Sequence, residues 1–265
     1  MYERGYVMSS MLGMMAMSLP STSTTRITAI GDSITAIACQ HWNLSMTYSA
    51  QLQRMLGPAF NITNAGNSGK TMLKHGRCPD PPAYPPADWC GGDCSYWHTD
   101  TYAAAMASEP DLVTILLGTN DAIGCNWDSS PWGTQGMYND SYWVDYADLI
   151  ATLKALPSKP AVWALVPPPL FPYDVDKYGP AAYAYNMTPG ALNTEIPQKL
   201  PAFARAHGAD NVVDLFALLG GHNATLLNTT HGGDTTCDGI HPQDASLTKI
   251  ATLLKEQVLA WVSQK

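Results

Sequence analysis

Short apolar runs recur along this chain, separated by segments in which apolar residues return at helical spacing. Five of the runs predict buried strands, over residues 26–30, 60–65, 112–117, 161–166 and 212–215. The clearest is Leu112 to Leu117, in which Thr114 is the one polar residue and which ends at Gly118. Because these runs are for the most part apolar and alternate with helical patterns, they predict a parallel sheet that is covered on both sides.

The segments between the strands predict helices. Apolar residues lie at helical spacing over 48–56, 146–156 and 247–261. Thr188 and Pro189 have the pattern of an N-cap and a first-turn proline, and we expect Pro197 and Pro201 to interrupt the helical segment after them. Alternating strands and helices predict an α/β fold, which binds ligands at the carboxyl ends of its strands. Residues 76–100 are expected to form a long loop over that face.

Composition limits the class of protein. With 265 residues, of which 46% are apolar and 14% charged, the chain can bury a large core, so we expect residues 21–265 to form a single domain. The formal charge of −8 argues against a nucleic-acid partner, because such proteins need a basic face. No apolar run reaches about 18 residues, so we expect no stable membrane span.

Three features together favour export to an oxidising compartment. Residues 1–20 contain a methionine-rich apolar run followed by Ala16-Met17-Ser18, which is typical of a signal peptide; a disordered N-terminus is the alternative. The six cysteines suit disulfides and stand at 39, 78, 90, 94, 125 and 237. Asn-x-Ser/Thr sequons occur at 43, 61, 139, 186, 223 and 228. These features predict a secreted glycoprotein with disulfides, and they leave the cysteine pairing open.

Two short polar segments follow predicted strands. Gly31-Asp32-Ser33-Ile34 can expose a serine hydroxyl at a strand-to-helix turn, although Gly-Asp-Ser is also a common turn sequence. Gly118-Thr119-Asn120-Asp121 can offer an asparagine amide to a developing negative charge. Alternatively, Asp121 caps a helix or ties down the loop.

A third segment, Asp238-Gly239-Ile240-His241-Pro242, precedes the last predicted helix. A tight turn here lets Asp238 accept a hydrogen bond from His241 Nδ1–H while Nε2 faces a serine hydroxyl. That is the arrangement of a catalytic base and the group that orients it. The alternative is a surface turn in which Asp238 is a cap and Pro242 begins the helix.

In combination, these segments resemble the sequence blocks of the SGNH hydrolases, also called GDSL esterases. The matching blocks are residues 31–33, 64–69, 118–121 and 238–241, in the family's order over residues 26–260. The resemblance implies a three-layer α/β/α flavodoxin-like fold with a five-stranded parallel sheet and no cofactor. Ile34 stands where the family has leucine, and the Gly-x-Ser-x-Gly elbow of the α/β-hydrolases is absent from the sequence.

The resemblance also assigns roles to individual residues. Ser33 would attack an ester carbonyl, His241 would take its proton, and Asp238 would hold the imidazole in place. The oxyanion hole would consist of the Ser33 N–H, the Gly69 N–H and the Asn120 side-chain amide.

Two further points concern this expected site. Gly66, two residues after Asn64, is an alternative to Gly69 as oxyanion donor. His222, His231 and Asp234 lie close in sequence to the Asp238 segment, but their spacings match no common ligand pattern, so we expect no metal site.

The expected substrate is a short-chain, O-acetyl ester on a carbohydrate. Leu117 to Asp121 with Trp127 resembles the family branch of sialate and polysaccharide O-acetylesterases. Aromatic rings suit sugar faces or, alternatively, pack in the core, and many stand in the expected active-face segments: Tyr84, Trp89, Tyr96, Trp97, Trp127, Trp132, Tyr138, Tyr142 and Trp143. A lipid esterase or thioesterase of the same family, and an inactive carbohydrate-binding glycoprotein, are the alternatives. The sequence leaves the oligomeric state open.

Overall fold

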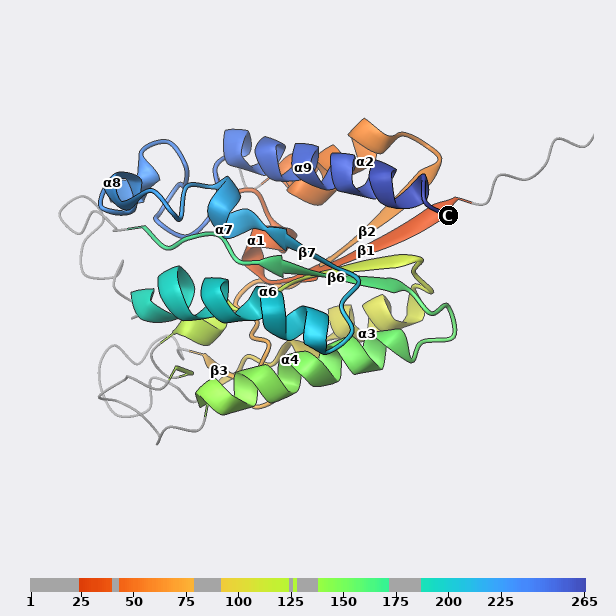
Figure 1. Cartoon of the computed structure of the whole chain (residues 1–265), viewed down its shortest axis with the longest axis horizontal. Helices are drawn as coiled ribbons and strands as arrows, with labels where there is room; N and C mark the ends of the chain where they lie inside the picture. The colour runs from red at the N-terminus through yellow and green to blue at the C-terminus, as the bar shows by residue number, and fades with distance from the viewer. Residues whose placement is uncertain (1–23, 40–42, 79–91, 124–125, 128–137, 172–186) are drawn as a thin grey trace, which may run out of the picture.

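A computed structural model describes residues 24–39, 43–78, 92–123, 126–127, 138–171 and 187–265 of the chain. Its centre is one parallel sheet in the order β2-β1-β5-β6-β7 (Figure 1). The strands are β1 Thr25–Gly31, β2 Phe60–Gly66, β5 Leu112–Leu116, β6 Ala161–Val166 and β7 Asn211–Asp214. The expected five-stranded parallel α/β fold is therefore confirmed.

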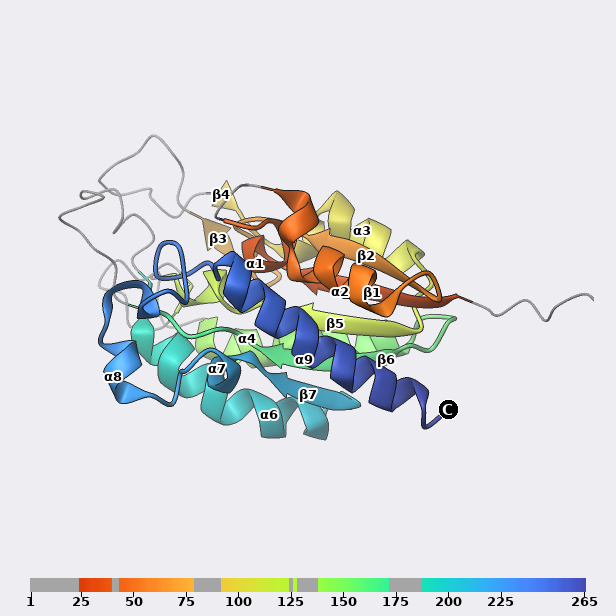
Figure 2. The same ribbon diagram turned by 90° about the horizontal axis from the view of Figure 1, so that it is seen from above.

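Helices cover both faces of the sheet. Figure 1 shows the three layers from the side, and Figure 2 looks down on one layer of helices with the sheet behind it. Helices α2 Tyr48–Leu56 and α9 Asp244–Val262 lie side by side on one face. The other face carries α3 Asp100–Ala107, α4 Tyr138–Lys154 and α6 Ile196–Ala206. Shorter helices are α1 Ser33–Ala36, α7 Leu215–Leu218 and α8 Ala224–Leu227; β3 Arg77–Cys78 and β4 Gly92–Asp93 form a separate antiparallel pair.

Alternation along strand β6 explains why its sequence is apolar throughout. In β6, Val162, Ala164 and Val166 pack in the cluster shared with α4 and α6. Between them, Trp163 and Leu165 pack in the opposite cluster with α9. Successive side chains of a strand point to opposite faces, so a sheet covered on both sides needs apolar residues at every position.

Two local expectations need correction. Pro201 does not interrupt the helix that contains it, because α6 runs through this residue to Ala206. Proline removes one backbone hydrogen bond, but the buried face formed by Ile196, Leu200 and Ala204 keeps the segment packed on the sheet. Helix α3 lies directly after the stretch expected to be a loop, and it was not predicted because Ala105 is its one buried residue.

The end of the sheet brings distant parts of the chain together. All five strands run in one direction, so their carboxyl ends meet at the edge on the left of Figure 1. Strand β1 lies between β2 and β5. The chain therefore places β2 on one side of β1 and the next strand of the sheet, β5, on the other side. Such a switch point leaves a crevice between the loops of neighbouring strands. The loop after β1 therefore lies between the loops after β2 and β5.

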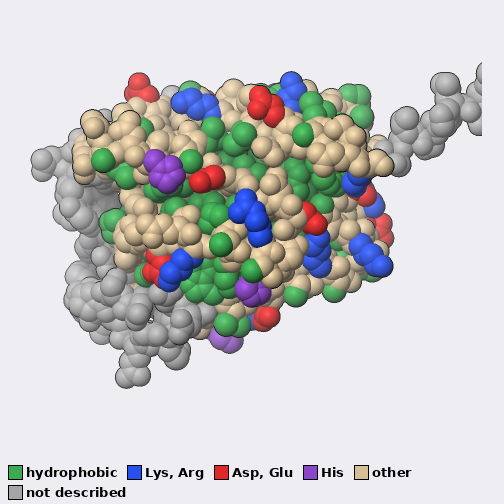
Figure 3. Space-filling model, in the orientation of Figure 1, with side chains coloured by type: hydrophobic (Ala, Val, Ile, Leu, Met, Phe, Trp, Pro, Cys, Tyr) green, Lys and Arg blue, Asp and Glu red, His purple; other side chains and the backbone are tan. Residues whose placement is uncertain are grey.

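The outer surface is mixed in charge. Acidic and basic side chains are interspersed on the face seen in Figure 3. The ion pairs between described residues include Lys154 with Asp210. None of the helices in the described part of the chain is both long and apolar enough to cross a membrane.

Candidate active site

Ser33 lies two residues after the end of strand β1 and is the first residue of α1. Asp32 caps this helix, because its Oδ1 accepts a hydrogen bond from the Ile34 N–H at 2.9 Å. The end of β2 approaches the same helix so closely that a Cβ on Gly66 would lie 2.4 Å from the Ala36 nitrogen. A glycine at the end of β2 therefore allows α1, and with it Ser33, to pack against the sheet edge.

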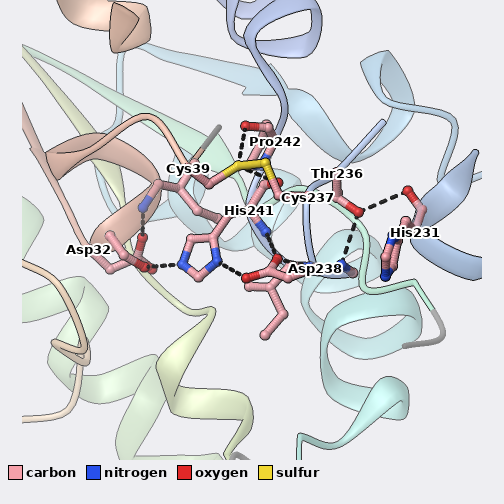
Figure 4. A network of polar contacts seen from close by, with 12 residues as sticks. Asp32, Cys39, His231, Thr236, Cys237, Asp238, His241 and Pro242 are labelled. Atoms are coloured by element: carbon pink, nitrogen blue, oxygen red, sulfur yellow. Dashed lines mark hydrogen bonds and ion pairs between the residues drawn. A yellow bond between two sulfur atoms is a disulfide. The ribbon is translucent and has the colours of Figure 1, made fainter. Parts of the chain in front are cut away.

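The hydroxyl of Ser33 meets a histidine that lies 208 positions away in the sequence. Ser33 Oγ is 2.8 Å from His241 Nε2. The other ring nitrogen, Nδ1, is 2.6 Å from Asp238 Oδ2, so the imidazole lies between a hydroxyl and a carboxylate (Figure 4). The fold thus brings together the three side chains that the sequence predicted as nucleophile, base and orienting acid.

Hydrogen bonds within the turn that carries Asp238 and His241 stabilise its conformation. The second carboxylate oxygen, Asp238 Oδ1, accepts the backbone N–H groups of Ile240 at 3.0 Å and His241 at 2.8 Å. The Thr236 hydroxyl accepts the Gly239 N–H at 3.0 Å. Helix α9 begins only at Asp244, so the alternative in which Pro242 starts the helix is wrong.

The charges of the pair suit proton transfer. Burial lowers the pKa of His241, but its hydrogen bond to Asp238 and the negative charges of Asp238 and Asp32 outweigh that effect and raise it. Burial raises the pKa of Asp238, but the hydrogen bond and positive charge of His241 reverse the shift and lower it. The two shifts have a common cause, since the ionised carboxylate of Asp238 and the protonated ring of His241 stabilise each other.

A second carboxylate, that of Asp32, lies next to Ser33 in the sequence and is buried. Asp32 is completely buried, and burial raises its pKa to about 6 although the Ile34 N–H and the charge of His241 oppose the shift. Its Oδ2 has no hydrogen-bond partner among the described residues. The sequence indicated Asp32 as part of a block but suggested no effect on His241.

The loop after β2 distinguishes between the two glycines considered as oxyanion donors. The Gly66 N–H is occupied, because it donates to Asn64 Oδ1 at 2.9 Å. Gly69 has a φ of +77°, which favours glycine, and its N–H donates to no other described residue. The geometry therefore favours Gly69 over Gly66.

Asn120 extends from the loop after β5 toward the same place. One hydrogen of its Nδ2 is donated to the Lys70 carbonyl, at 3.0 Å, which leaves the second for another acceptor. The residue is 8% exposed. Because Lys70 directly follows Gly69, this bond couples the Asn120 amide to the loop that carries Gly69.

The next residue, Asp121, ties the two loops together. Its carboxylate accepts the backbone N–H groups of Met72 at 2.9 Å and Leu73 at 3.0 Å. Complete burial raises its pKa to about 7, although those two hydrogen bonds oppose the shift. Of the alternatives that the sequence allowed for Asp121, tying down the loop is therefore the observed one.

Several aromatic residues expected on the active face are part of the core instead. Tyr96 and Tyr142 are 0% exposed and Trp127 is 5% exposed, because all three belong to the buried cluster on the face of the sheet that carries α3, α4 and α6. Trp97 and Trp143 are partly buried against the same cluster. The remaining four lie outside the residues whose side chains the structure describes: Tyr84, Trp89, Trp132 and Tyr138.

Two cysteines that the sequence left unassigned lie beside the site. Cys39, shortly after α1, forms a disulfide with Cys237, the residue before Asp238 (Figure 4). Cys94 is also disulfide-bonded. In the described part of the chain, no group of three or more histidine, cysteine or acidic residues is arranged to hold a metal ion. The predicted signal segment lies outside the described residues.

A hydroxyl, an imidazole and a carboxylate thus lie in a row at the carboxyl edge of the sheet. The chain belongs to the GDSL-like lipase/acylhydrolase family, whose model matches residues 29–246, and it is therefore a carboxylic ester hydrolase. The resemblance found in the sequence blocks is thereby confirmed.

Individual relatives agree with this assignment. An acetylxylan esterase from Xylanibacter ruminicola is 26% identical over 252 residues, which are 89% of this chain. The chain spans only 43% of the length of that relative. The aryl esterase of M. smegmatis has the same fold, with a TM-score of 0.59 and 19% identity over 89% of this chain and 99% of that one. Est24, a carbohydrate acetylesterase from Sinorhizobium meliloti, has a TM-score of 0.53 and 17% identity over 89% and 99%.

Proposed function

We propose that this protein removes acetyl groups from a carbohydrate by a covalent mechanism in which Ser33 is the nucleophile. The observation that carries the proposal is the hydrogen-bonded row from Ser33 Oγ through His241 to Asp238, at 2.8 and 2.6 Å. Distances in this range let a base take the hydroxyl proton as the oxygen attacks.

The proposed reaction has two halves. Ser33 Oγ attacks the acetyl carbonyl carbon while His241 Nε2 takes the hydroxyl proton, and the carbonyl oxygen becomes negatively charged. When this intermediate collapses, the sugar hydroxyl leaves with the proton held on His241. Water then attacks the acetyl-serine, with His241 again as base, and acetate and the free Ser33 hydroxyl are released. Asp238 stabilises the imidazolium that forms in each half.

The negative oxygen of each intermediate would be held by three donors. Strand order supports this arrangement, since the Ser33 loop lies between the loops that carry Gly69 and Asn120. The Ser33 and Gly69 N–H groups have no acceptor among the described residues, and Asn120 has one hydrogen to spare. Fixed donors of this kind stabilise the transition state without reorganising during the reaction.

Similarity to the acetylxylan esterase supports an acetyl group on a polysaccharide as the substrate. Export from the cell would suit a polymeric substrate, and the Cys39–Cys237 disulfide is compatible with an extracellular protein.

The test compares the wild type with Ser33→Ala. Acetate release would be measured on acetylated xylan, acetylated pectin and O-acetylated sialic acid, and labelling by a fluorophosphonate would be followed in parallel. We expect acetate release and labelling by the wild type and neither by the variant. A chromogenic octanoyl ester hydrolysed far faster than its acetyl counterpart would contradict the acetyl specificity. Glycan binding with no hydrolysis and no labelling would contradict the enzymatic function.

A further inference from the structure

The proposed serine and its base lie on two segments that are separated in the sequence by most of the domain. Ser33 begins α1 near the start of the described chain, and His241 lies just before the last helix. The 2.8 Å contact between them therefore lies where two separate segments of the chain meet, and we call this meeting point the joint. A base that moves away from its nucleophile by about 1 Å can cost about a hundredfold in rate.

Each side of this joint is rigid in itself. On one side, α1 is closed by the Ile37 N–H, which donates to the Ser33 carbonyl at 3.0 Å. On the other side, the Cys237 N–H donates to the His241 carbonyl at 2.9 Å, and Thr236 pairs with Pro242 in a β-bridge. These bonds fix each loop internally, but none of them crosses the joint.

The Cys39–Cys237 disulfide crosses it. Cys39 lies six residues after Ser33, and Cys237 directly precedes Asp238. The Cys39 sulfur also contacts the other end of the turn, at 3.4 Å from the His241 carbonyl oxygen and 3.3 Å from that of Pro242 (Figure 4). The disulfide thus holds the base-bearing turn at the end of the segment that bears the serine.

We propose that Cys39 and Cys237 are positioning residues, whose disulfide holds His241 Nε2 at the Ser33 hydroxyl. The proposal rests on the proposed function. Both cysteines are half-buried rather than enclosed in the core. Loss of the bond removes no group of the site, but it loosens the contact between the two loops and lets His241 move away from Ser33, so turnover falls while substrate binding is retained.

The test uses the double variant Cys39→Ser/Cys237→Ser, which leaves no unpaired thiol at this position. We expect kcat for an acetyl ester to fall between about ten- and a hundredfold, with KM changed by less than about twofold. The rate of fluorophosphonate labelling of Ser33 falls in parallel, because labelling also needs the aligned base.

Leu254→Ala is the matched control, because Leu254 lies on α9 in the core, away from the joint, and its truncation also lowers the melting temperature. All proteins are assayed well below their melting temperatures. If the double variant keeps the kcat and labelling rate of this control, the disulfide is only a stabilising element and the proposal is overturned.

The two proposals fail in different ways. If the wild type hydrolyses no acetyl ester, the proposed function fails, and the labelling rate alone then decides the role of the disulfide. A wild type that is not labelled overturns both proposals. A wild type that is labelled and hydrolyses esters, with a double variant that does so equally fast, overturns only the positioning role.

Discussion

The carboxylate of Asp121 accepts the backbone N–H of Met72 at 2.9 Å and thereby joins the loop after β5 to the loop after β2. Each of these loops carries one proposed oxyanion donor, Asn120 in the first and Gly69 in the second. Because the carboxylate is completely buried, water cannot replace these hydrogen bonds. The relative position of the two donors therefore depends on a residue that touches neither the nucleophile nor its base.

Asp121→Asn is expected to lower the free energy of unfolding by about 1–3 kcal/mol, because an amide can accept from only one side. The loss should be larger at about pH 5 than at about pH 8. Burial raises the pKa of Asp121 from 3.8 to about 7. The folded state therefore binds the proton more tightly than the unfolded state does. The contribution of Asp121 to the stability of the wild type declines as the pH rises from 3.8 to about 7, whereas asparagine does not titrate. Urea unfolding at both pH values measures the difference, and an equal loss at both would contradict the raised pKa.

Asp238→Asn should separate the orienting role of the carboxylate from its role in the turn. The asparagine oxygen can still accept the Ile240 and His241 N–H groups, so the fold should persist. Its amide, however, faces Nδ1 with a donor and favours the wrong imidazole tautomer. We expect kcat to fall about 10⁴-fold. Steady-state kinetics on an acetyl ester, with circular dichroism as a control for folding, measures the effect; a loss below about tenfold would argue against the role.

The pH–rate profile should lose activity on the acid side, since imidazolium cannot act as a base. The raised pKa of His241 places this loss at a higher pH than for an ordinary histidine. Asp32 contributes to the shift by its negative charge. In Asp32→Asn the pKa of His241 should fall and the acid limb should move to lower pH. Asp234→Asn, which removes an exposed carboxylate, is the control and should leave the limb unchanged. Equal profiles for Asp32→Asn and the wild type would rule out this coupling.

Asn120→Ala tests the oxyanion hole. The amide is expected to bind the carbonyl oxygen more strongly once that oxygen is negatively charged, so its removal should lower kcat by about 10²–10³-fold and leave KM nearly unchanged. Initial rates over a range of acetyl ester concentrations separate the two constants. A variant with raised KM and wild-type kcat would show that Asn120 serves substrate binding instead.

The sequence predicted the sheet well because the sheet is buried on both faces. Such strands need apolar residues at nearly every position: the run now observed as β6 has no polar residue, and β5 has one, the buried Thr114. Local signals failed where packing outweighed them. Pro201 stays within α6 because the buried face of that helix is continuous, and α3 has too few buried residues to show a helical period.

Aromatic residues show a further limit of sequence analysis. Tyr96 and Tyr142 are of a residue type that is common on sugar-binding faces, but both rings lie in the core. An aromatic side chain buries a large apolar area in either setting. The residue type alone therefore does not say whether an aromatic ring lies in the core or on a binding face.

By itself, the sequence determined the order of the strands along the chain and indicated the residues that are proposed to carry the chemistry, including Ser33, Asp238 and His241. These are local properties, since a turn of four residues can bring a carboxylate to an imidazole. Only the tertiary structure decided that β1 lies between β2 and β5, which of two glycines has a free N–H, and that Cys39 pairs with Cys237 across the site. Those features depend on contacts between segments far apart in the chain, which form only when the two layers of helices close over the sheet.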